Sequence, residues 1–177
     1  MKSFNFYFNL INGYYGDRAA VRSNVPYMAH IIEGVEILKC INGTDAAIAA
    51  YMIHPMFQDN DKLSENLKKY SHDIDGYVLN LALEYRDVAN DYLSFRKIKN
   101  LSEIRLSQTK EVNDMLIADK VQNYKDFLLY HADSHKNSKE LDQYFQNWFD
   151  RLDVNYKNLH SLCYTSNSLN ETNLNGE

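Results

Sequence analysis

The chain has 177 residues, a formal net charge of −5 at pH 7, 6 glycines and only 2 prolines. A chain of this length can bury enough apolar surface to fold as one domain without disulfides or a structural metal. Scarce glycine and proline exclude a turn-rich sandwich or barrel, and the acidic balance argues against a DNA, RNA or membrane surface, which needs clustered basic residues.

The first two predicted elements are helices. Residues 4–15 alternate apolar and polar residues in a pattern that fits a helix or a short strand, and we favour a helix. Apolar residues then recur at helical spacing from Asn24, which can cap the helix, with Pro26 in the first turn. The sequence Asn42-Gly43 predicts the end of this second helix.

The third predicted helix begins after Thr44, a suitable N-cap, and covers 45–54. Its small and apolar residues lie almost all round the helix, which is typical of a helix buried in the middle of a bundle. Pro55 is expected to end it, and to push His54 toward extended geometry, because proline disfavours helical backbone in the preceding residue.

The second half of the chain alternates polar connections with periodic apolar segments. The stretch 56–73 is expected to be a loop with a short helix at 65–70, and 91–106 a connection. Three more helices are predicted, at 74–89, 108–131 and 141–152.

The predicted elements define an all-α, single-domain bundle of about six or seven helices at residues 1–154. The remaining residues, 155–177, are rich in asparagine and serine, and we expect a polar, disordered tail there.

Two cysteines, Cys40 and Cys163, are too few for a disulfide framework and do not form a C-x-x-C pair. The N-terminal residues lack the continuous apolar run of a signal peptide, and no segment approaches the roughly 18 apolar residues of a membrane span. We therefore expect reduced thiols in a soluble, cytoplasmic protein.

Three residues with metal-binding side chains stand on or at the ends of predicted apolar helices: His30, His54 and Asp119. A single histidine on such a helix is more often a hydrogen-bonded core residue than a ligand. Helical bundles nevertheless build metal sites by directing side chains from several helices to one point. Asn123 follows Asp119 by one turn, so the two share a helix face.

Four segments carry these residues in a recognisable order: DRAAVRSNVPYMAH, ending at His30; AAIAAYMIHPMFQDND, containing His54; LIADKVQN, containing Asp119; and the aromatic QYFQNWF. Together they resemble the HD-domain phosphohydrolases, and within them the small alarmone hydrolases of the SpoT type, over about residues 8–153. The resemblance implies an HD-type bundle that removes pyrophosphate from the 3′ position of a guanosine tetraphosphate-like nucleotide. It also implies that the three residues hold a divalent ion, manganese or zinc.

The chain departs from that family at two positions near His54. Pro55 replaces the aspartate of the family's His-Asp doublet and offers no ligand atom. Gln58 and Asp59 stand where the family has Glu-Asp, the pair thought to orient or deprotonate water, and an amide cannot take up a proton near neutral pH. A second doublet, His72 and Asp73, falls beyond the loop, where the family has an ordinary helix start.

The resemblance further implies a nucleotide-binding set: Arg18, Arg22, Lys120, Asn123 and Tyr144. Arginine suits phosphate because its planar guanidinium donates two parallel hydrogen bonds. Each of these residues also has an ordinary structural explanation. The arginines fit a solvated loop, the lysine and asparagine a helix surface, and the tyrosine a hydrophobic core.

Three functions remain open from the sequence. The losses at Pro55 and Gln58 favour a protein that binds or sequesters a phosphorylated nucleotide with impaired catalysis. The alternatives are an active metal-dependent pyrophosphohydrolase with a three-ligand site, and an interaction protein whose last helix presents Trp148 and Phe149 to a partner. A homo-oligomer is compatible with all three.

Overall fold

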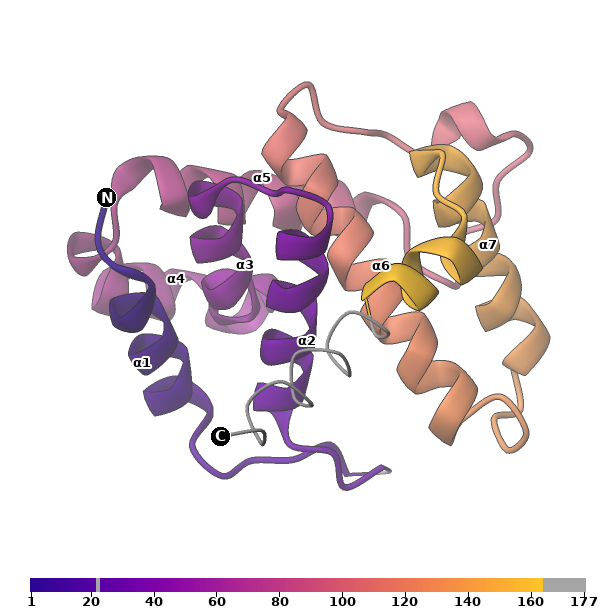
Figure 1. Ribbon diagram of the computed structural model, residues 1–177, viewed down its shortest axis with the longest axis horizontal. Coiled ribbons are helices and arrows are strands. Elements are labelled where there is room, and N and C mark those ends of the chain that lie inside the picture. Colours follow the sequence, from indigo (N-terminus) through magenta and orange to yellow (C-terminus); the bar gives the residue numbers. More distant parts are fainter. Residues whose placement is uncertain (22, 164–177) are drawn as a thin grey trace, which may run out of the picture.

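The computed structural model describes residues 1–21 and 23–163, which form a helical bundle (Figure 1). The described elements are the helices α1 (Phe4–Tyr15), α2 (Tyr27–Cys40), α3 (Asp45–Gln58), α4 (Asn60–Tyr70), α5 (Gly76–Asp91), α6 (Lys110–Tyr130) and α7 (Ser138–Leu152), with short 3-10 turns η1 (Ser71–Asp73) and η2 (Leu101–Glu103). These residues contain no strand, so the predicted all-α class is confirmed.

Helix α3 lies at the centre of the bundle. It packs against α1, α2, α4, α5 and α6, and most of its residues are buried, as its all-round apolar sequence predicts. Figure 1 shows α2 between α1 and α6, with α7 beyond α6 at the opposite end from α1. The core therefore runs across α2, α3 and α6, the helices that carry the candidate ligands.

Helices α2 and α3 approach each other closely at Gly34. A Cβ atom at this position would lie 2.1 Å from Cζ of Tyr51 on α3, far inside van der Waals contact. The missing side chain leaves room for the tyrosine ring, whose hydroxyl lies 3.3 Å from Nε2 of His30, one turn earlier on α2. This close approach positions the helix of the first histidine against the helix of the second.

Two expectations about the end of α3 are wrong. Pro55 lies inside the helix, which continues beyond it, and His54 is helical instead of extended. Met56 and Phe57 in the last turn are fully buried, so tertiary packing keeps the turn despite the missing N–H of proline. In an α-helix the N–H of residue 55 would donate to the carbonyl of Tyr51, but proline has no N–H. That carbonyl instead accepts a hydrogen bond from Nδ1 of His54 at 2.6 Å.

Other boundaries also differ from the prediction. Pro26 occupies the N-cap of α2, and Asn24 is a turn residue with φ 55°. Helix α4 begins at Asn60 because the carboxylate of Asp59 caps it, accepting from the backbone N–H of Asp61 at 2.9 Å. The stretch expected to be mainly loop is therefore mostly helical.

The helical domain extends past residue 154, where the sequence predicted a tail. Residues 156–163 are helical, and the rings of Tyr156 and Phe149 stack with centroids 5.4 Å apart. Cys163 is buried, and burial together with a hydrogen bond to Cys40 raises its pKa to about 12. The rest of the predicted tail lies outside the described residues. None of the helices in the described part has the length and apolar character needed to cross a membrane.

Candidate metal centre

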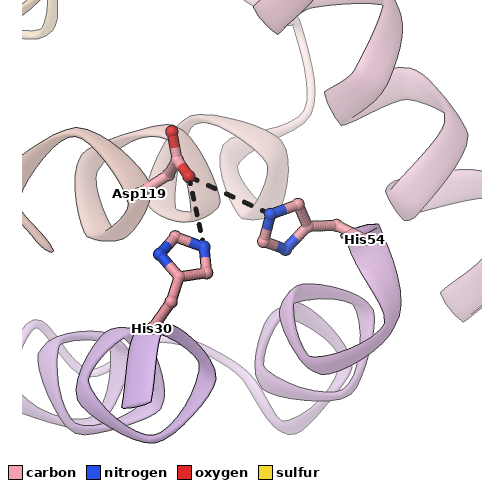
Figure 2. Close-up of side chains that lie close together, drawn as sticks. All are labelled: His30, His54 and Asp119. Carbon is pink, nitrogen blue, oxygen red and sulfur yellow. Dashed lines mark ion pairs between the residues drawn. The ribbon is translucent and has the colours of Figure 1, made fainter. Parts of the chain in front are cut away.

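The structure brings His30, His54 and Asp119 together from three helices. They come from α2, α3 and α6, and both imidazoles point toward the carboxylate (Figure 2). The Nε2 atoms of His30 and His54 lie 3.5 Å and 3.9 Å from the same Oδ1 atom of Asp119. One ligand atom from each residue lies within 4.8 Å of the other two.

The spacing and the donor atoms fit a divalent transition-metal ion. Zinc binds nitrogen and oxygen at about 2.1 Å, so two of its tetrahedral ligands are about 3.4 Å apart. The two distances to the carboxylate, 3.5 Å and 3.9 Å, are close to this value, and the whole set, which lies within 4.8 Å, would contract around such an ion. Imidazole and carboxylate suit zinc, iron or manganese. Three protein ligands leave a position for water or a substrate oxygen, which the ion would polarise.

Hydrogen bonds behind each imidazole decide which nitrogen faces the carboxylate. Nδ1 of His54 lies 2.6 Å from the carbonyl oxygen of Tyr51, which only accepts, so Nδ1 carries the proton. Nδ1 of His30 lies 2.5 Å from Oε1 of Gln122. In both rings Nε2 keeps its lone pair and faces Asp119, as in metal-binding histidines.

His54 is held in its neutral form. Burial, helped by repulsion from His30 and opposed by the attraction of Asp119, lowers the pKa of His54 to about 3. Metal ions bind neutral imidazole, so His54 can serve as a ligand at neutral pH without first losing a proton.

Asp119 remains charged although it is buried. Burial alone would raise its pKa, but Lys120, His30 and His54 hold the pKa of this carboxyl well below its usual range. Its Oδ2 accepts from Nζ of Lys120 at 2.8 Å, and its Oδ1 accepts from Nδ2 of Asn123 at 2.9 Å. Burial would lower the pKa of Lys120, but the attraction of Asp119 outweighs it and raises that pKa.

The cluster forms part of the wall of a cavity of about 520 Å³, a volume typical of small-molecule sites. The cavity also includes several residues that the resemblance singles out, namely Pro55, Gln58, Lys120, Asn123 and Tyr144. Much of the remaining lining is aromatic. The metal cluster and most of the predicted nucleotide-binding set therefore share one cavity.

Gln58 holds its position through only one end of its amide. Its Nε2 donates to Oδ1 of Asn90 at 2.5 Å, whereas its Oε1 is buried and makes no hydrogen bond to a described residue. A buried acceptor without a donor is costly, and because this oxygen is closed to solvent, a ligand in the cavity would reach it only after the side chain moves.

Several predicted residues are not brought into the cavity. Arg18 donates to two backbone carbonyls at the end of α1 and is not part of the lining. Asp59 is exposed and caps α4. His72 and Asp73 pair with each other on the surface in η1. Arg22 lies outside the described residues.

Three residues around the cluster were not found from the sequence: Gln122, Tyr51 and Tyr85. Gln122 supports His30, and its place one turn after Asp119 was an available signal. The pKa of Tyr85 is raised mainly by burial and, to a smaller extent, by the nearby negative charge of Asp119. The two tyrosines stand on apolar helices, where a sequence does not distinguish a core ring from one beside a site.

Comparisons with models of protein families, with curated proteins and with solved structures found no match for this chain. The fold and the site define an all-α domain with a candidate two-histidine, one-carboxylate metal centre. Any function assigned to it depends on the chemistry of that centre and its cavity.

Proposed function

We propose that this chain binds a phosphorylated nucleotide beside a divalent metal ion and that its hydrolytic activity is impaired. The ion would be held by His30, His54 and Asp119. The observation that carries the proposal is the convergence of these three side chains at the wall of the cavity. The resemblance to HD-domain alarmone hydrolases suggests a guanosine tetraphosphate-like ligand.

The charges around the cavity make anion binding depend on the ion. Of the described lining residues, Asp119 and Asp126 are acidic and Lys120 is the basic one. Lys120 is paired with Asp119 at 2.8 Å, so its charge is already offset. Asp126 is likewise offset by Lys125 at 2.9 Å, so the paired charges of the described lining leave little attraction for a phosphate. A divalent ion would add the missing positive charge.

The aromatic lining suits the base of a nucleotide. Tyr15, Tyr27, Phe127, Tyr144 and Phe145 contribute rings to the cavity. Stacking of a base on an aromatic side chain is worth about 1–3 kcal/mol and tolerates different bases. These rings would hold the base while the phosphates reach the ion.

The lining supports binding better than it supports water activation. Pro55 contributes no ligand atom, and the free oxygen of Gln58 can accept a hydrogen bond but cannot act as a general base near neutral pH. Among the described lining residues, the carboxylates are both engaged, Asp119 with Lys120 and Asp126 with Lys125.

A slow hydrolase is the second candidate. Three protein ligands leave open coordination positions, and a divalent ion lowers the pKa of its bound water enough to generate hydroxide near neutral pH. Such an enzyme would need no carboxylate base.

The deciding experiment combines metal analysis of the purified chain with calorimetric binding of guanosine tetraphosphate and an assay of pyrophosphate release. We expect stoichiometric metal, metal-dependent nucleotide binding and no turnover. Pro55→Asp combined with Gln58→Glu should restore cleavage, whereas Asp59→Asn, an exposed change nearby, should not.

The remaining outcomes separate the alternatives. Turnover by the unmodified chain would favour the slow hydrolase over the binding protein. A chain that binds neither metal nor the nucleotide would contradict both. The interaction protein expected to present Trp148 and Phe149 has no support in the structure, because both rings are buried.

A further inference from the structure

We infer that Gln122 is a positioning residue of the metal centre: its side-chain carbonyl fixes the tautomer of His30 and thereby directs the Nε2 lone pair of that ring at the ion. The inference rests on the metal site of the proposed function. It adds a residue that neither the resemblance nor the ligand set contains.

The amide of Gln122 has one orientation that satisfies its neighbours. The side chain is fully buried on α6. Its Nε2 donates to Oδ2 of Asp126 at 2.8 Å and to Oε2 of Glu33 at 3.3 Å. Carboxylates only accept hydrogen bonds, so the amide nitrogen must face them, and Oε1 must face His30.

The two carboxylates that orient Gln122 are anchored independently of it. Nζ of Lys125 lies 2.9 Å from Oδ1 of Asp126 and also donates to Glu33. This lysine is largely buried, and it offsets negative charge that would otherwise be costly there. The amide is therefore clamped by groups from both α2 and α6.

The fixed orientation of the Gln122 amide determines the tautomer of His30. Because Oε1 of Gln122 accepts from Nδ1 at 2.5 Å, Nε2 is left with its lone pair, 3.5 Å from Oδ1 of Asp119. Two acceptors that face each other repel unless a cation or a proton lies between them. The hydroxyl of Tyr51, 3.3 Å from Nε2, can occupy this lone pair in the metal-free protein.

His30 and His54 differ in how their tautomers are set. His54 donates to a backbone carbonyl, that of Tyr51, which no side-chain substitution removes. His30 depends on the side chain of Gln122, so its support can be removed by one substitution. Losing such an outer partner of a metal-bound histidine typically costs about 10- to 100-fold in metal affinity.

The test compares Gln122→Met, which keeps the shape of the side chain and removes its polar atoms, with Gln122→Glu. The adjacent carboxylates of Asp126 and Glu33 favour a protonated carboxyl at position 122, whose O–H can face them while its carbonyl oxygen accepts from His30. Gln143→Met, the same change at an exposed position of α7, is the matched control. Two quantities are measured on the full chain: zinc affinity by competition with a chelating dye, and the tautomer of His30 in the metal-free protein by nitrogen-15 NMR.

We expect Gln122→Met to weaken zinc binding by about 10- to 100-fold and to mix the two tautomers of His30, while the control leaves both readouts unchanged. Gln122→Glu should keep the tautomer and lose less affinity than Gln122→Met. Unchanged tautomer and affinity in Gln122→Met would overturn the inference. If that variant does not fold, a changed tautomer in folded Gln122→Glu overturns it instead.

Failure of the proposed function gives a different result. If the unmodified chain binds no zinc, the metal site is wrong, whereas the tautomer measurement on the metal-free protein still decides whether Gln122 positions His30.

Discussion

Two parts of the cavity wall differ in how their polar groups are satisfied. In the ligand cluster, Asp119 has hydrogen-bond partners at both oxygens. Each histidine donates a hydrogen bond from Nδ1, the ring nitrogen that faces away from Asp119. At the end of α3, Pro55 has no donor and Gln58 keeps a buried oxygen without a partner. The polar groups around the candidate ligands are therefore satisfied, whereas those at the end of α3 are not.

The largest effect is expected from Asp119→Asn, which removes the one charged ligand and leaves the buried Lys120 without its carboxylate. Zinc affinity should fall by more than the roughly 100-fold that an outer partner costs. The free energy of unfolding should fall by about 3 kcal/mol, because an unpaired buried charge is strongly destabilising. Zinc titration and urea unfolding measure the two losses.

Asp114→Asn is the matched control for this variant, because Asp114 is also buried on α6 but pairs with the exposed Lys110. Adding Lys120→Met to Asp119→Asn should recover stability without recovering zinc binding. If Asp119→Asn binds zinc as tightly as the unmodified chain, the cluster is not a metal site and the contrast within the cavity wall disappears.

Removal of the metal should weaken nucleotide binding by about 100-fold, which corresponds to about 2.7 kcal/mol. The reason is that the lysines beside the two acidic lining residues are already paired with them, so the ion supplies the positive charge that attracts the phosphates. Calorimetric titration with guanosine tetraphosphate before and after dialysis against a chelator measures the change. Equal affinities in the two samples would mean that the phosphates bind elsewhere or through groups other than the ion.

The stability of the metal-free protein should fall as pH is lowered from about 6.5 to 5. The pKa of His54 is lowered from 6.5 to about 3 in the folded state, so between these values the unfolded chain takes up a proton that the folded chain does not. Stability decreases by up to about 1.4 kcal/mol per pH unit, or about 2 kcal/mol by pH 5. The lowered pKa of Asp119 acts in the same direction, only below its usual value of 3.8.

Urea unfolding at a series of pH values measures this slope. His54→Gln should lower the dependence of the unfolding free energy on pH by the contribution of one proton, up to about 1.4 kcal/mol per pH unit. His72→Gln, at an exposed histidine, should leave this dependence unchanged. A slope that is the same with and without the His54 ring would show that the ring is not kept neutral by burial, and so is not prepared to bind an ion.

Hydrophobic periodicity was enough to predict most helices because each buries one face, or in the case of 45–54 nearly all of its surface. It missed the first half of α4 and the helical residues 156–163. It failed at Pro55, where the local preference of proline is overridden by the buried side chains of Met56 and Phe57. That outcome depends on what α3 packs against, and the packing partners come from segments distant in the sequence.

The candidate ligands and Asn123, which donates to Asp119, could be found from residue type and order. The role of Gln122 could not, although its helix position makes it a neighbour of Asp119. Gln122 follows the LIADK segment as an ordinary polar residue, and only the fold places it between His30 and the carboxylates of Glu33 and Asp126. Conversely, Arg18 was predicted to bind phosphate, yet its guanidinium donates hydrogen bonds to backbone carbonyls at the end of α1. Local sequence does not reveal which partner a long side chain reaches.

The smallest effect is expected at Asp59, where the resemblance and the structure assign different roles to one carboxylate. As the N-cap of α4 it accepts from the N–H of Asp61, so Asp59→Ala should cost about 1 kcal/mol of unfolding free energy. Asp59→Asn should recover it, because asparagine also caps. Zinc and nucleotide affinities should stay within twofold in both variants. A loss of turnover on adding Asp59→Asn to the variant that carries Pro55→Asp and Gln58→Glu would instead assign this carboxylate to water activation. Asp59 would then have two roles. Asparagine keeps the cap of α4, so a loss of turnover without a loss of stability would come from the missing carboxylate charge.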